Sequence, residues 1–363
     1  MATKKKEDVP VVDKLQAFKD ALKKVSSEIK DENVYVFGDK EIEKVPTVST
    51  GSLALDNILG GGVARGRVIE FYGPEASGKT SIAMTVLSNF QKLGGTGVLI
   101  DCEQAADFNY FKKLGVNVEK LGYSQAIIAE DVLNMVRKLC NSGAVDIIVI
   151  DSIPSMIPRA ELADDALDKA SVASVARLMS KGLKYIIKAA NDNNCTVIFL
   201  NQVRSNVGVM YGPQTSQPGG QALKFFATQR VEIKRRDKIE EGGEIIGNKI
   251  AMKCIKNKIA PPFGECTSVL TFNRGINQNA EIMDLGEDLG VIYREGAGTT
   301  YFCNIDEGID ISGFGATRLA DDPTKIKIAI GKAKVVQEIE ANEALAKELS
   351  KQLVQKLNEK NHG

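Results

Sequence analysis

A phosphate-binding pattern constrains this chain more than any other feature. The residues GPEASGKT at positions 73–80 follow the apolar run RVIEFY and open the helical sequence TSIAMTVLSNF. This is the GxxxxGK[ST] spacing in the strand-to-helix context that it requires. Glycines let backbone N–H groups turn inward, and the helix N-terminus adds positive potential, so the segment predicts a site for a polyphosphate.

Side chains within this loop have distinct expected roles. Lys79 can reach the β- and γ-phosphates, and the Thr80 hydroxyl can bind Mg²⁺. The residues expected to contact the nucleotide are Gly73, Pro74, Glu75, Ala76, Ser77, Gly78, Lys79, Thr80 and Ser81.

Polar side chains also end three other apolar runs. VDIIVID ends in Asp151, a second candidate Mg²⁺ ligand, although many buried strands end in aspartate as a turn residue. GVLID leads to Glu103, which we assign as the base for the water that attacks the γ-phosphate; the alternative is an acid that caps the next helix. TVIFLN leads to Gln202, a candidate γ-phosphate sensor. Ligands bind at the carboxyl ends of strands in open α/β sheets, so we expect these residues to share one site.

Short apolar runs alternate with helical patterns over residues 47–275. Strands are expected at 67–72, 97–102, 146–151, 196–201, 229–234 and 251–256, and helices at 79–93, 126–141 and 171–192. This order predicts an α/β fold with a mainly parallel central sheet covered on both faces. The last two strands lack a long helix between them, so we expect them to extend the sheet in antiparallel fashion.

Two smaller parts flank this core. Residues 12–30 place apolar side chains at spacings of three and four, which predicts an amphipathic helix that either folds onto the core or docks on another chain. Residues 276–363 predict a small α+β or helical module that ends in one helix from about 332 to 360. The expected organisation is an N-terminal helix and linker over 1–46, a core over 47–275 and a C-terminal domain over 276–363.

Composition excludes several chemistries. The only histidine is His362, which removes Ser-His-Asp, Cys-His and histidine-ligated zinc sites from the core. The six cysteines form no CxxC pair, and most fit the role of small apolar side chains within the strands of a protein in a reducing cytosol. Because no apolar run reaches the roughly 18 residues of a membrane span, we expect a cytoplasmic protein without membrane association. A formal net charge of zero means that nucleic-acid binding must come from local basic surface or from oligomerisation.

The segment RSNVGVMYGPQTSQPGG at 204–220 shows no apolar periodicity. Loops of this length in compact domains are usually functional, and this one follows Gln202 closely, which favours a ligand-binding loop over a surface insertion. Basic residues follow it, among them Lys256 and Lys258 in KNK. They could form a solvated face or reach a phosphate, either of DNA or of a neighbour's ATP, and spacing does not decide.

The motifs GPEASGKT, IDCEQAAD, VDIIVIDS, NQVRSNVGVMYG, PGGQALKFF and KNKIAPPF together resemble the RecA family of homologous recombinases. The resemblance covers roughly residues 12–300. It implies a RecA-like core that binds ATP and Mg²⁺, a homo-oligomeric helical filament on single-stranded DNA, and strand exchange with double-stranded DNA in recombination and repair. A LexA-like repressor is a further implied partner, through co-protease activity in the SOS response.

The resemblance also implies roles for individual residues. The catalytic set is Glu103 as water-activating glutamate, Gln202 as γ-phosphate sensor, and Lys79. The adenine is implied to lie beside Asp107, Tyr110 and Phe272, and Lys256 and Lys258 match lysines that reach the neighbour's ATP. The implied DNA loops are 158–173 and 204–220, with Arg177, Arg204, Asn206, Gly208, Met210, Gly219 and Gly220 as contacts. The N-terminal helix and Phe225 match positions at the interface between protomers.

Two other functions share parts of this pattern. A ring helicase or other motor with the same core usually carries an N-terminal protein-binding domain, where this chain has a short helix. An ATP-binding regulatory scaffold would use the 204–220 segment for protein contacts. Salt-dependent binding to single-stranded DNA that ATP stimulates would distinguish a recombinase from a scaffold.

Overall fold

A computed structural model describes residues 14–30, 34, 36, 44–162, 172–205, 215–216, 219–295, 298–311 and 315–362. The chain divides into two compact units, Met1–Val45 and Pro46–Gly363. No helix within the described ranges is long and apolar enough to cross a membrane.

Among the residues of the first unit that the structure describes, one helix forms, α1 (Lys14–Ile29), which confirms the amphipathic helix expected near the N-terminus. Its expected first residues, 12 and 13, lie outside the described part of the chain. None of its residues is buried, and the rings and branched chains of Leu15, Phe18, Val25 and Ile29 are exposed. Its apolar stripe is therefore not covered within this unit.

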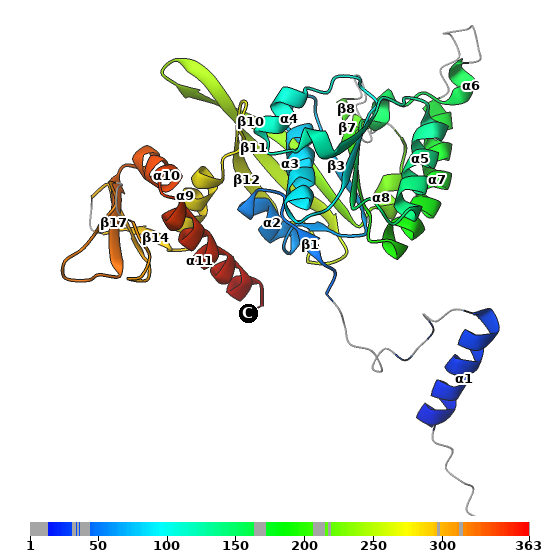
Figure 1. Cartoon of the computed structure of the whole chain (residues 1–363), viewed down its shortest axis with the longest axis horizontal. Coiled ribbons are helices and arrows are strands. Elements are labelled where there is room, and N and C mark those ends of the chain that lie inside the picture. Colours follow the sequence, from blue (N-terminus) through cyan, green and yellow to red (C-terminus); the bar gives the residue numbers. More distant parts are fainter. Residues whose placement is uncertain are drawn as a thin grey trace, which may run out of the picture. The chain divides into compact units, whose positions relative to one another are not determined.

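The second unit is built on a nine-stranded sheet of order β13-β12-β11-β10-β3-β7-β6-β4-β5 (Figure 1). Its parallel strands are β3 (Val68–Gly73), β4 (Gly97–Asp101), β5 (Leu121–Ser124), β6 (Ile147–Asp151), β7 (Thr196–Gln202) and β10 (Gln229–Glu241). The antiparallel strands are β11 (Glu244–Asn257), β12 (Glu265–Thr271) and β13 (Gly275–Ile276). Two short pairs lie outside this sheet: β1 (Thr47–Val48) with β2 (Val63–Ala64), and β8 (Arg204–Ser205) with β9 (Thr215–Ser216).

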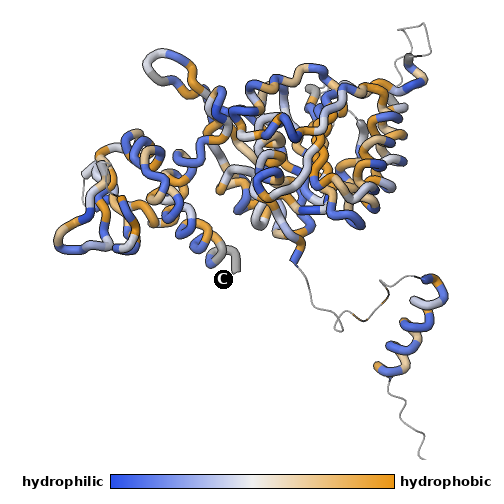
Figure 2. The backbone as a smooth tube through the Cα atoms, viewed as in Figure 1, coloured by the Kyte–Doolittle hydropathy of each residue, from blue (hydrophilic) through white to orange (hydrophobic). Residues whose placement is uncertain are grey.

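Helices cover this sheet and complete the core. They are α2 (Leu53–Leu59), α3 (Lys79–Lys92), α4 (Phe108–Lys113), α5 (Ala129–Asn141), α6 (Arg159–Leu162), α7 (Val172–Asp192) and α8 (Ala222–Phe226), with 3-10 turns at Val118–Lys120 and Ile153–Ser155. One buried cluster joins α5, α7 and α8 to alternate residues of the strands, such as Ile148, Ile150 and Phe199. The middle of the second unit is accordingly mostly hydrophobic along the tube in Figure 2. Strands buried on both faces explain why their sequences are continuous apolar runs.

The expected fold class is confirmed, with corrections at the sheet's edges. β10 does not belong to an antiparallel extension: it pairs in parallel with β3, and only β11 and the strands after it are antiparallel. The long connection between β7 and β10 supplies the crossover that a parallel strand needs. β10 and β11 also run beyond their expected ends as a long hairpin that projects from the sheet (Figure 1). β5 escaped prediction because it is a four-residue edge strand with two exposed central residues.

The last part of the chain forms a small α+β module. Its sheet has the order β14-β15-β17-β16, from β14 (Ile292–Arg294), β15 (Thr300–Asn304), β16 (Thr317–Arg318) and β17 (Lys325–Ile330). It shares a buried cluster with α9 (Gln278–Asp288), α10 (Lys332–Ala341) and α11 (Glu343–His362). The domain boundaries near residues 46 and 275 stay predictions.

The prediction of a single C-terminal helix from about 332 to 360 is wrong. Asn342 has an extended backbone conformation that ends α10, and its side-chain Oδ1 accepts a hydrogen bond from the Leu345 backbone N–H at 3.0 Å. A buried asparagine that caps the next helix therefore divides the pattern into α10 and α11.

Candidate nucleotide-binding site

The phosphate-binding loop joins β3 to α3 at the carboxyl end of the central strand. Gly78 has φ of +93°, a left-handed conformation that favours glycine, and a Cβ there would lie 2.7 Å from Leu270 Cδ2. Lys79 Nζ donates to the carbonyls of Pro74 at 2.7 Å and Gly73 at 3.3 Å. Burial lowers the pKa of Lys79, while the carboxylates of Asp151 and Glu103 act in the opposite direction. Backbone oxygens thus hold the lysine inside the loop, where we expect it to contact phosphates.

Thr80 and Asp151 form the second part of the site. Thr80 Oγ1 donates to Asp151 Oδ2 at 2.7 Å, which links the start of α3 to the end of β6. Burial raises the pKa of Asp151 to about 6, against the hydrogen bond from Thr80, which lowers it. A hydroxyl beside a carboxylate is a donor set that suits Mg²⁺, because Mg²⁺ takes oxygen ligands and keeps several waters. These two residues therefore fit the expected ion, which they would hold through a hydroxyl and a carboxylate oxygen.

Glu103 lies beside this pair and has two hydrogen-bond donors. Gln202 Nε2 donates to Glu103 Oε1 at 3.2 Å, and the Ser152 hydroxyl donates to the same oxygen. The structure thus brings together the strand-end residues of β4, β6 and β7, as the parallel arrangement predicted. In this arrangement the Glu103 side chain contacts a serine and a glutamine rather than capping α4, whose N-cap is Asp107.

A cavity of about 140 Å³ adjoins these residues. Asp107 caps α4 by accepting from the backbone N–H groups of Asn109 and Tyr110, and the Tyr110 hydroxyl lies 2.6 Å from Ser81 Oγ. The cavity is lined by Thr80, Leu99, Asp101, Glu103, Ala105, Ala106, Asp107, Tyr110, Phe111 and Asp151. Phe272, the third residue expected beside the adenine, does not belong to this lining, and it is 46% exposed.

The lysines expected at a subunit interface lie at the end of β11. Lys256 Nζ donates to the carbonyls of Lys224 at 2.8 Å and Phe225 at 2.7 Å, both in α8. Burial, followed by the positive charge of Lys258, lowers the pKa of Lys256. Lys258 is exposed one residue beyond the strand, and Phe225 is 72% exposed. Lys256 is thus connected to the residue that carries this exposed ring through the carbonyls of α8.

The residues expected to contact DNA are only partly described. Arg177 is exposed on α7 and lines a shallow surface with Lys181 and Lys184. Gly219 and Gly220 both have positive φ, and a Cβ on either would meet a side chain at 2.8 Å, which explains two successive glycines. Asn206, Gly208 and Met210 lie outside the described residues, as does the side chain of Arg204 and most of the 158–173 loop.

Several residues around the site carried no sequence signal that we used. Asp101 Oδ2 accepts hydrogen bonds from the Tyr123 hydroxyl and from the Ala106 backbone N–H, each at 3.0 Å, and so closes the turn that carries Glu103. Asn201 Nδ2 donates to Glu70 Oε1 at 2.9 Å, in the strand that precedes the phosphate loop. In the sequence, only the glutamate within the apolar run RVIEFY indicated this buried contact.

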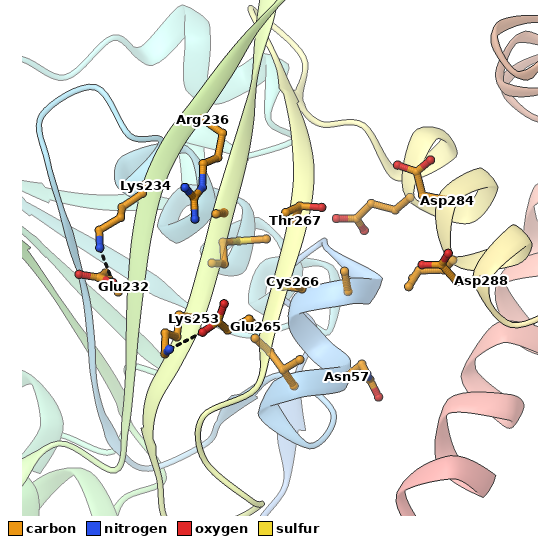
Figure 3. A pocket seen from close by; sticks show the side chains of 16 residues that line it. Asn57, Glu232, Lys234, Arg236, Lys253, Glu265, Cys266, Thr267, Asp284 and Asp288 are labelled. Carbon is orange, nitrogen blue, oxygen red and sulfur yellow. Dashed lines mark hydrogen bonds and ion pairs between the residues drawn. The ribbon is translucent and has the colours of Figure 1, made fainter.

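A second cavity, of about 560 Å³, lies away from the phosphate loop, between strands β10, β11 and β12 and helices α2 and α9. Figure 3 shows Lys234 paired with Glu232 and Lys253 paired with Glu265 on the strands, and Asp284 and Asp288 on α9. Four of the charged residues on the strand side thus form two ion pairs. None of the residues predicted to bind nucleotide or DNA lines this cavity.

The fold and the loop geometry define a P-loop ATPase whose site lies at the carboxyl edge of a mainly parallel sheet. The family model for the RecA N-terminal domain matches residues 16–277. The chain is 42% identical to Protein RecA of Oceanobacillus iheyensis over 290 residues, which cover 80% of this chain and 83% of that protein. It is 40% identical to Protein RecA of Ruminococcus albus over 305 residues, covering 82% and 76% respectively.

The chain therefore belongs to the RecA family. As a family member it is an ATP-dependent recombinase of homologous recombination and repair, with DNA-dependent ATPase activity, and it assembles into filaments on DNA.

Proposed function

We propose that this recombinase binds ATP with Mg²⁺ through Lys79, Thr80 and Asp151, and that Glu103 activates the water that hydrolyses it. Gln202 senses the γ-phosphate and transmits its presence to the DNA-binding segment that follows β7. Nucleotide state thereby controls how the filament holds single-stranded DNA and pairs it with double-stranded DNA.

One observation carries this proposal: polar side chains at or just beyond the carboxyl ends of β3, β4, β6 and β7 lie together beside the phosphate loop. Thr80 contacts Asp151, and Glu103 contacts Gln202, although these residues come from four separate segments. A cation, a hydroxyl, two carboxylates and an amide around a phosphate-binding loop form the set that ATP hydrolysis uses. A Mg²⁺ ion held by Thr80 and Asp151 would neutralise charge on the phosphates.

The proposal places the ATP between two protomers. Lys256 and Lys258 would approach the neighbour's triphosphate, and α1 would bury its exposed apolar stripe on the adjacent protomer. Support comes from the exposed apolar residues of α1 and from the hydrogen bond of Lys256 to the backbone carbonyl of Phe225, whose side chain is exposed. Exposed apolar side chains on one helical face are typical of a docking surface.

The DNA-binding part of the proposal assigns Arg177, Gly219 and Gly220 to the DNA surface, together with Arg204, Asn206, Gly208 and Met210. The exposed basic face of α7 around Arg177 supports it, because phosphate contacts from lysine and arginine supply most of the affinity for a nucleic-acid backbone. A cytoplasmic location and a LexA-like repressor as a further partner complete the proposal; both rest on family membership alone.

The proposal is tested by measuring binding to a fluorescent single-stranded oligonucleotide with ATP, with ADP and without nucleotide, at increasing salt. We expect binding that ATP strengthens and salt weakens, together with ATP hydrolysis that DNA stimulates. ATP hydrolysis without any response to DNA would contradict it.

A further inference from the structure

Ser152 is fixed beside Glu103 by the register of two parallel strands. Asp101 of β4 pairs with Asp151 of β6, and the Asp151 carbonyl accepts hydrogen bonds from the backbone N–H groups of Cys102 at 2.6 Å and Glu103 at 3.1 Å. The backbone of Glu103 is thereby tied to the peptide that precedes Ser152. The Ser152 side chain is 1% exposed, and its hydroxyl donates to Glu103 Oε1.

Gln202, the other donor to Glu103 Oε1, is held less firmly. It ends β7 opposite Gly73 of the phosphate loop and is only half-buried. Its longer side chain has more rotatable bonds than that of serine, and it contacts the carboxylate at 3.2 Å in an exposed environment. The two donors therefore differ: the serine is buried and tied through the backbone, whereas the glutamine can move.

We propose that Ser152 is the positioning residue of Glu103 and keeps this carboxylate oriented when Gln202 leaves it for the γ-phosphate. This inference rests on the proposed function, in which Glu103 is the base. Both donors contact Oε1, so we assign Oε2 to the attacking water. The water oxygen bonds to the γ-phosphorus, the bond from that phosphorus to the bridging oxygen of ADP breaks, and the water proton passes to Oε2.

The alternative role for Ser152 is purely structural, as a buried hydroxyl that fills space at the end of β6. A structural role would affect folding or ATP binding, whereas a positioning role would affect turnover alone. The two roles are therefore separated by comparing kcat with KM for ATP on protein assembled on single-stranded DNA.

The experiment compares Ser152→Ala, Ser152→Thr and the control Ser88→Ala. Ser88 is 0% exposed on α3, and its hydroxyl has no hydrogen-bond partner among the described residues, so its removal deletes a buried hydroxyl far from catalysis. Steady-state ATP hydrolysis, ATP affinity and thermal unfolding are measured for each variant. Glu103→Gln and the double variant with Ser152→Ala are measured in parallel.

We expect Ser152→Ala to lower kcat about tenfold or more with KM changed less than about twofold. Ser152→Thr should recover most of the rate because it restores the hydroxyl, and Ser88→Ala should leave kcat unchanged. Ser152→Ala should add no further loss in the Glu103→Gln background. An unchanged kcat in Ser152→Ala, or an equal further loss in the double variant, would overturn this inference. Normal hydrolysis by Glu103→Gln would instead refute the assignment of the base.

Discussion

Gln202 Nε2 donates a hydrogen bond to Glu103 Oε1 at 3.2 Å, across 99 residues of sequence. The amide at the end of β7 therefore contacts the carboxylate just beyond β4. This contact joins the residue that we assign to hydrolysis with a residue close to the start of the proposed DNA-binding segment. A γ-phosphate that attracts Gln202 would therefore affect both Glu103 and the segment that follows β7.

Glu103→Gln should separate ATP binding from turnover. The amide keeps the shape of the side chain but cannot accept the water proton, so hydrolysis should fall by about 10²- to 10⁴-fold while ATP affinity stays within a few fold. Phosphate release and fluorescent nucleotide binding measure the two properties. Glu119→Gln, an exposed change elsewhere, serves as the control. Hydrolysis at the normal rate would show that another group is the base.

Lys79→Ala should abolish the effect of ATP on DNA binding. The substitution removes the ammonium that lies 2.7 Å from the Pro74 carbonyl inside the loop, and with it the main charge facing the phosphates. Single-stranded DNA binding should then be the same with and without ATP. Lys92→Ala, at the exposed end of the same helix, should retain the ATP response. Retention in Lys79→Ala would contradict the assignment.

Mixing two inactive variants should restore activity if Lys256 acts on the neighbour's ATP. A Lys256→Ala protomer retains Lys79 and Glu103, and a Lys79→Ala neighbour can supply the missing Lys256 at the shared junction. We expect DNA-stimulated hydrolysis in the mixture to exceed the sum of the separate variants. A mixture of Lys79→Ala with Glu103→Gln should show no gain, because both changes affect the same protomer's half of the site. An absence of gain in the first mixture would place Lys256 outside the neighbour's site.

Arg230→Ala should destabilise the core rather than alter chemistry directly. Arg230 Nε lies 2.5 Å from Glu70 Oε2, and both side chains are almost fully buried. Removing the arginine leaves a buried carboxylate without this cation, which typically costs about 3–5 kcal/mol. Chemical denaturation should show that loss, whereas Arg274→Ala, which breaks an exposed ion pair with Glu340, should cost less than about 1 kcal/mol. Similar losses for both variants would contradict the expected difference.

Glu281 should make stability depend on pH near neutrality. Its carboxylate accepts from Ser52 Oγ at 2.6 Å and from the Leu53 backbone N–H at 2.7 Å, and burial raises its pKa to about 7 from 4.5. Because the folded state binds this proton more tightly than the unfolded state, its stabilisation is complete below about pH 4.5 and is lost as pH rises to about 7. The loss amounts to about 3 kcal/mol.

Thermal unfolding of the natural chain and of Glu281→Gln, compared from pH 5 to 8, tests this expectation. The difference between them should shift in favour of the glutamine variant as pH rises, because the amide does not ionise. Asp288→Asn, on the exposed side of the same helix, is the matched control. A difference that is constant across this range would contradict the account.

The convergence of polar side chains at one edge of the sheet could be predicted because apolar runs mark where strands end. Asp151, Glu103 and Gln202 each follow such a run, and parallel strands place their carboxyl ends side by side. The sequence could not predict the contact between Ser152 and Glu103, because it depends on the register of β4 against β6.

Other features escaped prediction because tertiary contacts decide them. The carbonyls of α8 that hold Lys256 come from a five-residue helix with no clear periodicity. The break at Asn342 lies inside a pattern that otherwise reads as one helix, and burial of that asparagine is visible only in the structure. The parallel pairing of β10 with β3 likewise depends on how the chain returns after β7.

Electron microscopy of the protein on long single-stranded DNA tests the central claim most directly. With a slowly hydrolysed ATP analogue and Mg²⁺, we predict continuous helical filaments, and with no nucleotide, only sparse or absent assemblies. Lys79→Ala should form none of the analogue-dependent filaments. Two results would contradict the claim that ATP between protomers controls DNA binding. One is protein that stays monomeric and does not bind DNA under any nucleotide condition. The other is filaments that form equally well without nucleotide.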